Sequence, residues 1–134
     1  MLERLRATVL GERMAHPPDL GDEALPAGIV LRRGRLIPWL GGRLAGMRGR
    51  AAAVTLGRTI IIDPDARLTR RLLAHELTHV RQWEGDRLFP LRYSLATLRH
   101  GYRNNPYEVE AREVEAFAAR TQAGEEPSEW RDQS

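Results

Sequence analysis

Cysteine and lysine are both absent from this chain of 134 residues. Without cysteine there are no disulfide bonds and no thiolate ligands, so any zinc site must use histidine and carboxylate side chains. Residues 1–103 carry 18 arginines against 10 acidic residues, and residues 104–134 carry 3 against 8. The arginines are scattered, and no group of aromatic and basic residues forms a stacking platform, so we expect no nucleic-acid partner.

Long apolar runs are absent as well. No segment approaches the roughly 18–20 apolar residues that span a bilayer, so we predict no transmembrane segment. Residues 1–13 mix charged and apolar side chains and lack the apolar stretch of a signal peptide. They predict a short amphipathic helix that packs on its own domain. The default location is cytoplasmic, with export by a specialised system left open.

The length and an apolar content of 42% fit a single domain over residues 1–134. We place its core at about 28–122 and a polar tail at 124–134, and we make no prediction about its oligomeric state. The expected elements are strands at 28–33, 35–37, 51–56 and 58–62, a glycine-rich loop with a helical turn at 38–49, and helices at about 64–84, 90–100 and 106–122. They predict an α+β fold with a small antiparallel sheet packed on a helix.

The feature that carries chemistry is a complete HExxH motif, His75-Glu76-Leu77-Thr78-His79. On an α-helix, residues four apart lie on one face, one turn from each other, so both imidazoles can reach a single metal ion. Glu76 can turn toward a water at that metal and accept its proton. The motif predicts a zinc hydrolase, most simply a peptidase, provided that a third ligand exists.

The surrounding residues predict that the motif lies on a helix. Asp63 is a candidate N-cap, Pro64 suits the first helical position, and Gly85 suits the C-terminal cap. Between them the histidines and apolar residues follow the three-or-four spacing of a buried face. The alternative is an ordinary core helix, but a buried, unpaired carboxylate at Glu76 would destabilise such a helix, whereas a metal ion would neutralise it.

We expect the third ligand on a later helix. His16 and His100 have no flanking pattern that supports them as ligands. Asn105 can cap a helix that Pro106 opens, and Glu108 projects from the first turn of that helix. Glu108 is therefore the stronger candidate.

With these two motifs the sequence resembles the gluzincin class of zinc metallopeptidases, which join HExxH on one helix to a glutamate on a later helix. It looks closest to minimal bacterial versions, including small peptidase-like domains associated with extracellular contractile injection systems. Those carry a strand, a helix with HELTHV and a helix opening N-P-[FY]-E-x-E-A. The matching segments here are residues 59–62, 75–80 and 105–111, and the resemblance covers about residues 51–120.

The resemblance implies a minimal zincin-like domain in which Zn²⁺ is bound and a peptide or protein is hydrolysed. The implied ligands are His75, His79 and Glu108, with Glu76 as general base. It also implies that strand 58–62 forms the rim of the cleft, where an extended peptide could add as a further strand.

One position departs from the related pattern. Arg112 stands where related enzymes often place an aspartate that orients a ligand histidine, so a carbonyl or Glu115 must serve instead, or turnover is weak. Two alternatives to a zinc metalloendopeptidase follow: a zinc-binding scaffold that cleaves nothing, and a basic nucleic-acid-binding protein with a chance motif. The candidate donors for a developing oxyanion are Tyr93, His100, Tyr102 and Tyr107.

Overall fold

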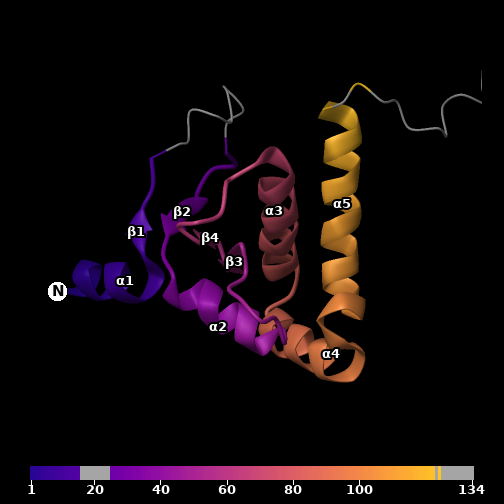
Figure 1. Ribbon diagram of the computed structural model, residues 1–134, viewed down its shortest axis with the longest axis horizontal. Coiled ribbons are helices and arrows are strands. Elements are labelled where there is room, and N and C mark those ends of the chain that lie inside the picture. Colours follow the sequence, from indigo (N-terminus) through magenta and orange to yellow (C-terminus); the bar gives the residue numbers. More distant parts are fainter. Residues whose placement is uncertain (16–24, 123, 125–134) are drawn as a thin grey trace, which may run out of the picture.

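The computed structural model describes residues 1–15, 25–122 and 124, which form an α+β fold (Figure 1). The elements in chain order are α1 (Leu2–Leu10), β1 (Glu12–Arg13), β2 (Val30–Arg33), α2 (Leu36–Leu44), β3 (Ala53–Leu56), β4 (Thr59–Ile62), α3 (Arg70–Gly85), α4 (Phe89–Asn104) and α5 (Pro106–Gln122). The predicted fold class is confirmed. His16 and nearly all of the tail at 124–134 lie outside the described residues. Within the described part of the chain, no helix has both the length and the apolar character that crossing a membrane requires.

The four strands form one mixed sheet in the order β1-β2-β4-β3. β3 and β4 are the predicted hairpin and pair antiparallel. β2 pairs with β4 in parallel, with Leu31 opposite Ile60, so the prediction of an antiparallel sheet was wrong here. The predicted strand at 35–37 does not form, because Leu36 and Ile37 begin α2, which lies in the crossover at 34–58 that a parallel pair requires.

α2 occupies a segment for which the sequence predicted the end of a hairpin and a glycine-rich loop with a helical turn, and it is longer than that turn. Pro38 lies in the first turn, where its missing N–H costs no helical hydrogen bond. Gly42 allows a close approach, because a Cβ at this position would overlap the carbonyl oxygen of Gly49. The residue types that indicated a loop are therefore the ones that fit this helix against its neighbours.

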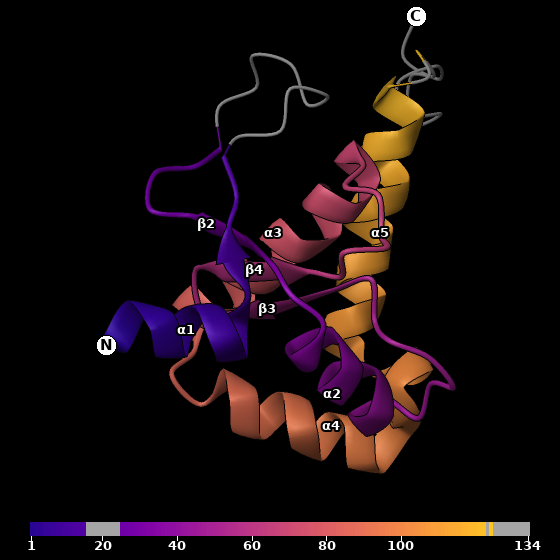
Figure 2. The same ribbon diagram turned by 60° about the vertical axis from the view of Figure 1, so that its left-hand side comes forward.

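The hydrophobic core lies between the sheet and α3. β4 is an interior strand covered on both faces, which explains why Ile60, Ile61 and Ile62 are all fully buried. Leu31 and Val80 complete the centre of the core. α3 lies between the sheet and α5, and the two helices run side by side (Figure 1 and Figure 2). α3 thus packs against the sheet on one face and against α5 on another.

α3 begins later than the sequence predicts. Its N-cap is Thr69, whose hydroxyl accepts the backbone N–H of Leu72 at 3.1 Å. Asp63 is instead paired with Arg50, and its carboxylate accepts the backbone N–H of Asp65 at 2.9 Å. This long-range ion pair holds Asp63 in a turn before the helix. α3 ends one residue later than predicted, because Gly85 is its last helical residue and Asp86 is the C-cap.

α4 and α5 are the two later helices that the sequence predicts. α4 continues past the expected end to Asn104, although Gly101, with φ 77°, interrupts its regular geometry. α5 begins at Pro106, and Asn105 caps it as predicted by accepting the backbone N–H of Tyr107 at 3.0 Å. The side chain of Asn105 is fully buried.

α1 forms inside the predicted range and packs on its own domain as predicted, in contact with α2, although none of its residues is fully buried. Its apolar residues Leu2 and Leu5 are exposed. Polar contacts hold it instead: the buried Arg32 donates to Glu3 at 3.1 Å and to the carbonyl oxygen of Gly11 at 2.9 Å. The apolar pattern of α1 is therefore not a core pattern.

Candidate metal centre

Three side chains from two helices converge at one point. His75 and His79 on α3 present their Nε2 atoms to the carboxylate of Glu108 on α5, at 3.1 and 3.2 Å. One donor atom from each lies within 4.8 Å of the other two. Two imidazole nitrogens and one carboxylate oxygen are a donor set that zinc accepts while keeping a fourth position open. The structure thus brings the predicted ligands together into a group that can hold a metal ion.

Each imidazole is also held at its second nitrogen. Nδ1 of His75 lies 3.1 Å from Oε2 of Glu115, and Nδ1 of His79 lies 2.8 Å from Oε1 of Gln82. Glu115 is itself paired with Arg71 at 3.3 Å. Acceptors in this position fix the tautomer and orientation of metal-binding imidazoles and leave Nε2 for the metal. Glu115 is therefore the acceptor for His75. The sequence left either Glu115 or a backbone carbonyl in this role, in place of the aspartate that related enzymes often have at position 112.

Arg112 turns away from the centre and donates to the carbonyl oxygen of Arg103. Glu115 lies three residues further along α5, close to one turn. The sequence did not predict Gln82, although it follows His79 by three residues and so shares its helical face. This spacing of three residues could have identified Gln82 as a hydrogen-bond partner of His79.

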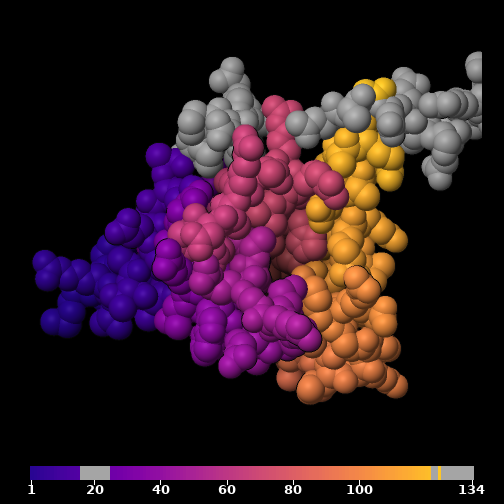
Figure 3. Space-filling model, in the orientation of Figure 1, coloured from indigo at the N-terminus to yellow at the C-terminus, as the bar shows by residue number. Residues whose placement is uncertain are grey.

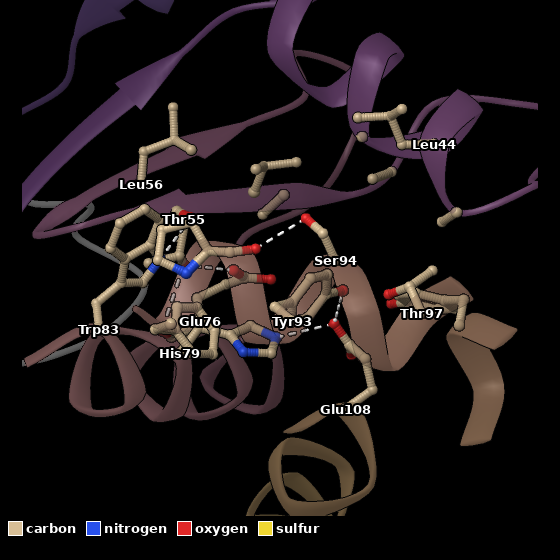
Figure 4. A pocket seen from close by; sticks show the side chains of 18 of the residues that line it. Leu44, Thr55, Leu56, Glu76, His79, Trp83, Tyr93, Ser94, Thr97 and Glu108 are labelled. Carbon is tan, nitrogen blue, oxygen red and sulfur yellow. Dashed lines mark hydrogen bonds and ion pairs between the residues drawn. The ribbon is translucent and has the colours of Figure 1, made fainter. Parts of the chain in front are cut away.

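The carboxylate of Glu108 is surrounded by hydrogen-bond donors. The hydroxyl of Tyr93 donates to its Oε1 at 2.6 Å, as Figure 4 shows. Burial alone would raise the pKa of Glu108, but hydrogen bonds from His75, His79 and Tyr93 outweigh burial and hold this pKa well below its usual range. Glu108 is therefore an anion, as a metal-binding carboxylate must be.

The pKa values of His75 and His79 are both raised above the usual value. Burial acts in the opposite direction, but the hydrogen bond to Glu108 and the negative charges of Glu108 and Glu76 outweigh it. The centre therefore attracts positive charge. A metal ion would be stabilised by the same field and would compete with protons for the two imidazoles.

Glu76 lies beside the three converging side chains and is only 4% exposed. Its Oε2 accepts a hydrogen bond from the hydroxyl of Thr55 on β3 at 2.6 Å. Burial raises the pKa of Glu76. A carboxyl group with a raised pKa is suited to proton transfer near neutral pH. Nothing in the local pattern of the β3–β4 hairpin marked Thr55 as its partner.

The centre opens into a cleft of about 470 Å³, and Figure 3 shows the surface hollowed between α2 (magenta) and the α4–α5 segment (orange). All four residues of β3 line this cleft. The prediction that strand 58–62 forms the rim was wrong, because β4 lies inside the sheet with β2 on one side and β3 on the other. The strand edge beside the centre is therefore that of β3.

The four candidate oxyanion donors separate into two pairs. Tyr93 and Tyr102 line the cleft, and burial together with the nearby charge of Glu108 raises the pKa of both phenols. Outside the lining, His100 is exposed and Tyr107 packs edge-on against Phe89. Both cleft tyrosines are therefore neutral phenols, and the O–H of Tyr93 is already donated to Glu108 at 2.6 Å.

A family model described as the eCIS core domain matches residues 44–87. This match links the chain to proteins of extracellular contractile injection systems. The matched range contains β3, β4 and α3 with the whole HExxH motif, and it ends before Glu108 and Glu115. No curated protein and no solved structure matches the chain.

Proposed function

We propose that this protein is a zinc-dependent metallopeptidase. The observation that carries the proposal is the convergence of His75, His79 and Glu108, with Glu76 buried beside them, in a cleft bordered by a strand edge. Nitrogen ligands favour zinc over calcium and magnesium, which prefer oxygen. Zinc held by these residues would supply the Lewis acidity that polarises a peptide carbonyl and acidifies water.

The remaining chemistry belongs to the chain itself. Oε2 of Glu76 takes the hydrogen bond from Thr55, so we assign Oε1 as the atom that accepts a proton from the attacking water and returns it to the leaving amine. Tyr93 and the two histidines fix the carboxylate of Glu108. An extended substrate can add beside β3, as in other strand-addition complexes. It would share the carbonyl oxygen of Thr55 with the indole N–H of Trp83, which donates to that oxygen at 3.2 Å.

The test is the isosteric substitution Glu76→Gln. It should retain one zinc per chain, measured by elemental analysis, while cleavage of a diverse peptide pool falls by roughly 10²- to 10⁴-fold. Glu84→Gln is the matched control, because Glu84 lies on the same helix but is exposed and paired with Arg58. Cleavage by the Glu76→Gln protein at the wild-type rate would overturn the assigned role.

A second candidate is a zinc-binding scaffold without turnover, the alternative that the sequence also allows. The family match favours it, because that match is to the core domain of a multiprotein system rather than to a peptidase. A metal joining α3 to α5 would then serve stability alone. The wild-type protein would bind zinc and lose thermal stability on chelation, yet cleave no peptide in the pool.

A further inference from the structure

We infer that the cleft selects polypeptide segments with apolar side chains on both sides of the scissile bond and rejects charged ones. This inference rests on the proposed peptidase function and adds the substrate class. It begins from charge: the chain carries 21 arginines, yet no arginine is among the described residues that line the cleft. The charged or titratable acidic and imidazole groups of the lining all belong to the metal centre.

Apolar side chains lie on both sides of that centre. In Figure 4, Leu56 and Trp83 lie on one side of Glu76 and His79, and Leu44 lies on the other. Phe89 extends the lining beyond α3, and Met47 and Leu98 belong to it as well. A peptide that runs along β3 past Glu76 therefore meets apolar surface before and after the reacting bond.

Three of the five hydroxyl groups of the lining already donate hydrogen bonds within the protein. Thr55 donates to Glu76, Tyr93 donates to Glu108, and Ser94 donates to the carbonyl oxygen of Pro90 at 2.8 Å. Away from the metal centre, a charged substrate side chain entering the cleft would lose hydration and meet mainly apolar side chains. An apolar side chain would gain free energy by leaving water.

The inference is tested with matched peptides that differ only at the two residues flanking one scissile bond, carrying leucine, aspartate or arginine. The zinc-loaded wild-type protein should cleave the leucine peptide with a kcat/KM at least about 10-fold higher than the other two. Equal kcat/KM values for the three peptides would overturn the inference and leave the peptidase function standing. Cleavage of no peptide at all would overturn the proposed function, and the inference with it.

A substitution that changes the peptide preference is a second and more specific test. Leu98 is 85% exposed at the mouth of the cleft, so Leu98→Arg leaves the core untouched and should raise kcat/KM for the aspartate peptide relative to the leucine peptide by at least about 10-fold. Leu95→Arg is the control, because Leu95 lies on the same helix, is 56% exposed and is outside the lining. The same shift in both variants, or in neither, would contradict the role of the lining.

Discussion

The centre between α3 and α5 and the N-terminal helix α1 follow opposite rules of burial. Nine polar or charged side chains are buried among the described residues, against eight hydrophobic ones. Five of those nine belong to the centre or contact it, namely Thr55, His75, Glu76, His79 and Glu108. In α1 no residue is fully buried, and Leu2 and Leu5 are exposed to solvent. The fold thus buries charged side chains at the candidate metal centre and leaves apolar side chains of α1 exposed.

Buried charge is tolerated because its partners are complete. No buried side-chain nitrogen or oxygen within the described residues lacks a hydrogen-bond partner. Leaving such a group unpaired would cost about 1–3 kcal/mol, and more if it is charged. The comparison therefore predicts large effects for substitutions at the centre and small effects in α1.

The largest effect is expected for Glu108→Gln, which replaces a buried anion by a neutral amide. Zinc affinity should fall by more than about 100-fold. Loss of a residue that only hydrogen-bonds to a metal ligand typically lowers the affinity by about 10- to 100-fold, and loss of a ligand should lower it further. Zinc titration against a competing chelator measures it. Glu110→Gln, at an exposed position of the same helix, should leave the affinity unchanged. Undiminished affinity in the Glu108 variant would remove it from the ligand set.

A smaller loss is expected for Glu115→Gln. The amide accepts more weakly from Nδ1 of His75 and no longer pairs with Arg71, so zinc affinity should fall by about 10- to 100-fold. The matched control is Glu113→Gln, at an exposed position of α5. If both variants bind zinc like the wild type, Glu115 does not orient the imidazole.

Asn105→Ala should affect stability more than metal binding. Its amide donates to the carbonyl oxygen of Tyr93 at 3.2 Å and to Thr97 at 2.9 Å, and its side-chain oxygen caps α5. Losing these contacts should lower the free energy of unfolding by about 1–3 kcal/mol, measured by urea denaturation. The neighbouring exposed Asn104→Ala should change it far less, and equal effects would refute the role of the cap.

The smallest effect is expected in α1. Leu2 is 76% exposed, so Leu2→Ser should change the free energy of unfolding by less than about 0.5 kcal/mol in the same denaturation experiment. A loss above about 1 kcal/mol would show that the apolar side chains of α1 contribute to the core, and the contrast between the two regions would fail.

Local signals in the sequence predicted what lies within one helix or one hairpin. The three-or-four spacing placed His75 and His79 on one face, and the cap at Asn105 placed Glu108 in the first turn of α5. The β-branched run predicted β4 and its hairpin with β3. Each of these depends on neighbours within a few residues, which is why a single sequence carries them.

Long-range contacts account for the errors. Asp63 is a residue type that often caps helices, but here it forms an ion pair with Arg50 and lies before the start of α3. Gly42 indicated a loop, but it lies in α2, where its lack of a side chain allows the backbone at Gly49 to pack closely against it. The acceptor of His75 depends on the rotation of α5 against α3, which no local pattern sets. Such features depend on how elements meet, so the sequence pattern left them open.

The parallel pairing of β2 with β4 also predicts the order in which the strands of the sheet pair during folding. β3 and β4 are separated by two residues, so their hairpin closes with little loss of chain entropy. β2 can join β4 only after the crossover at 34–58 has closed, which makes it the slower contact. We therefore expect the edge that faces the cleft to form early. The N-terminal strands then complete the sheet from its far side.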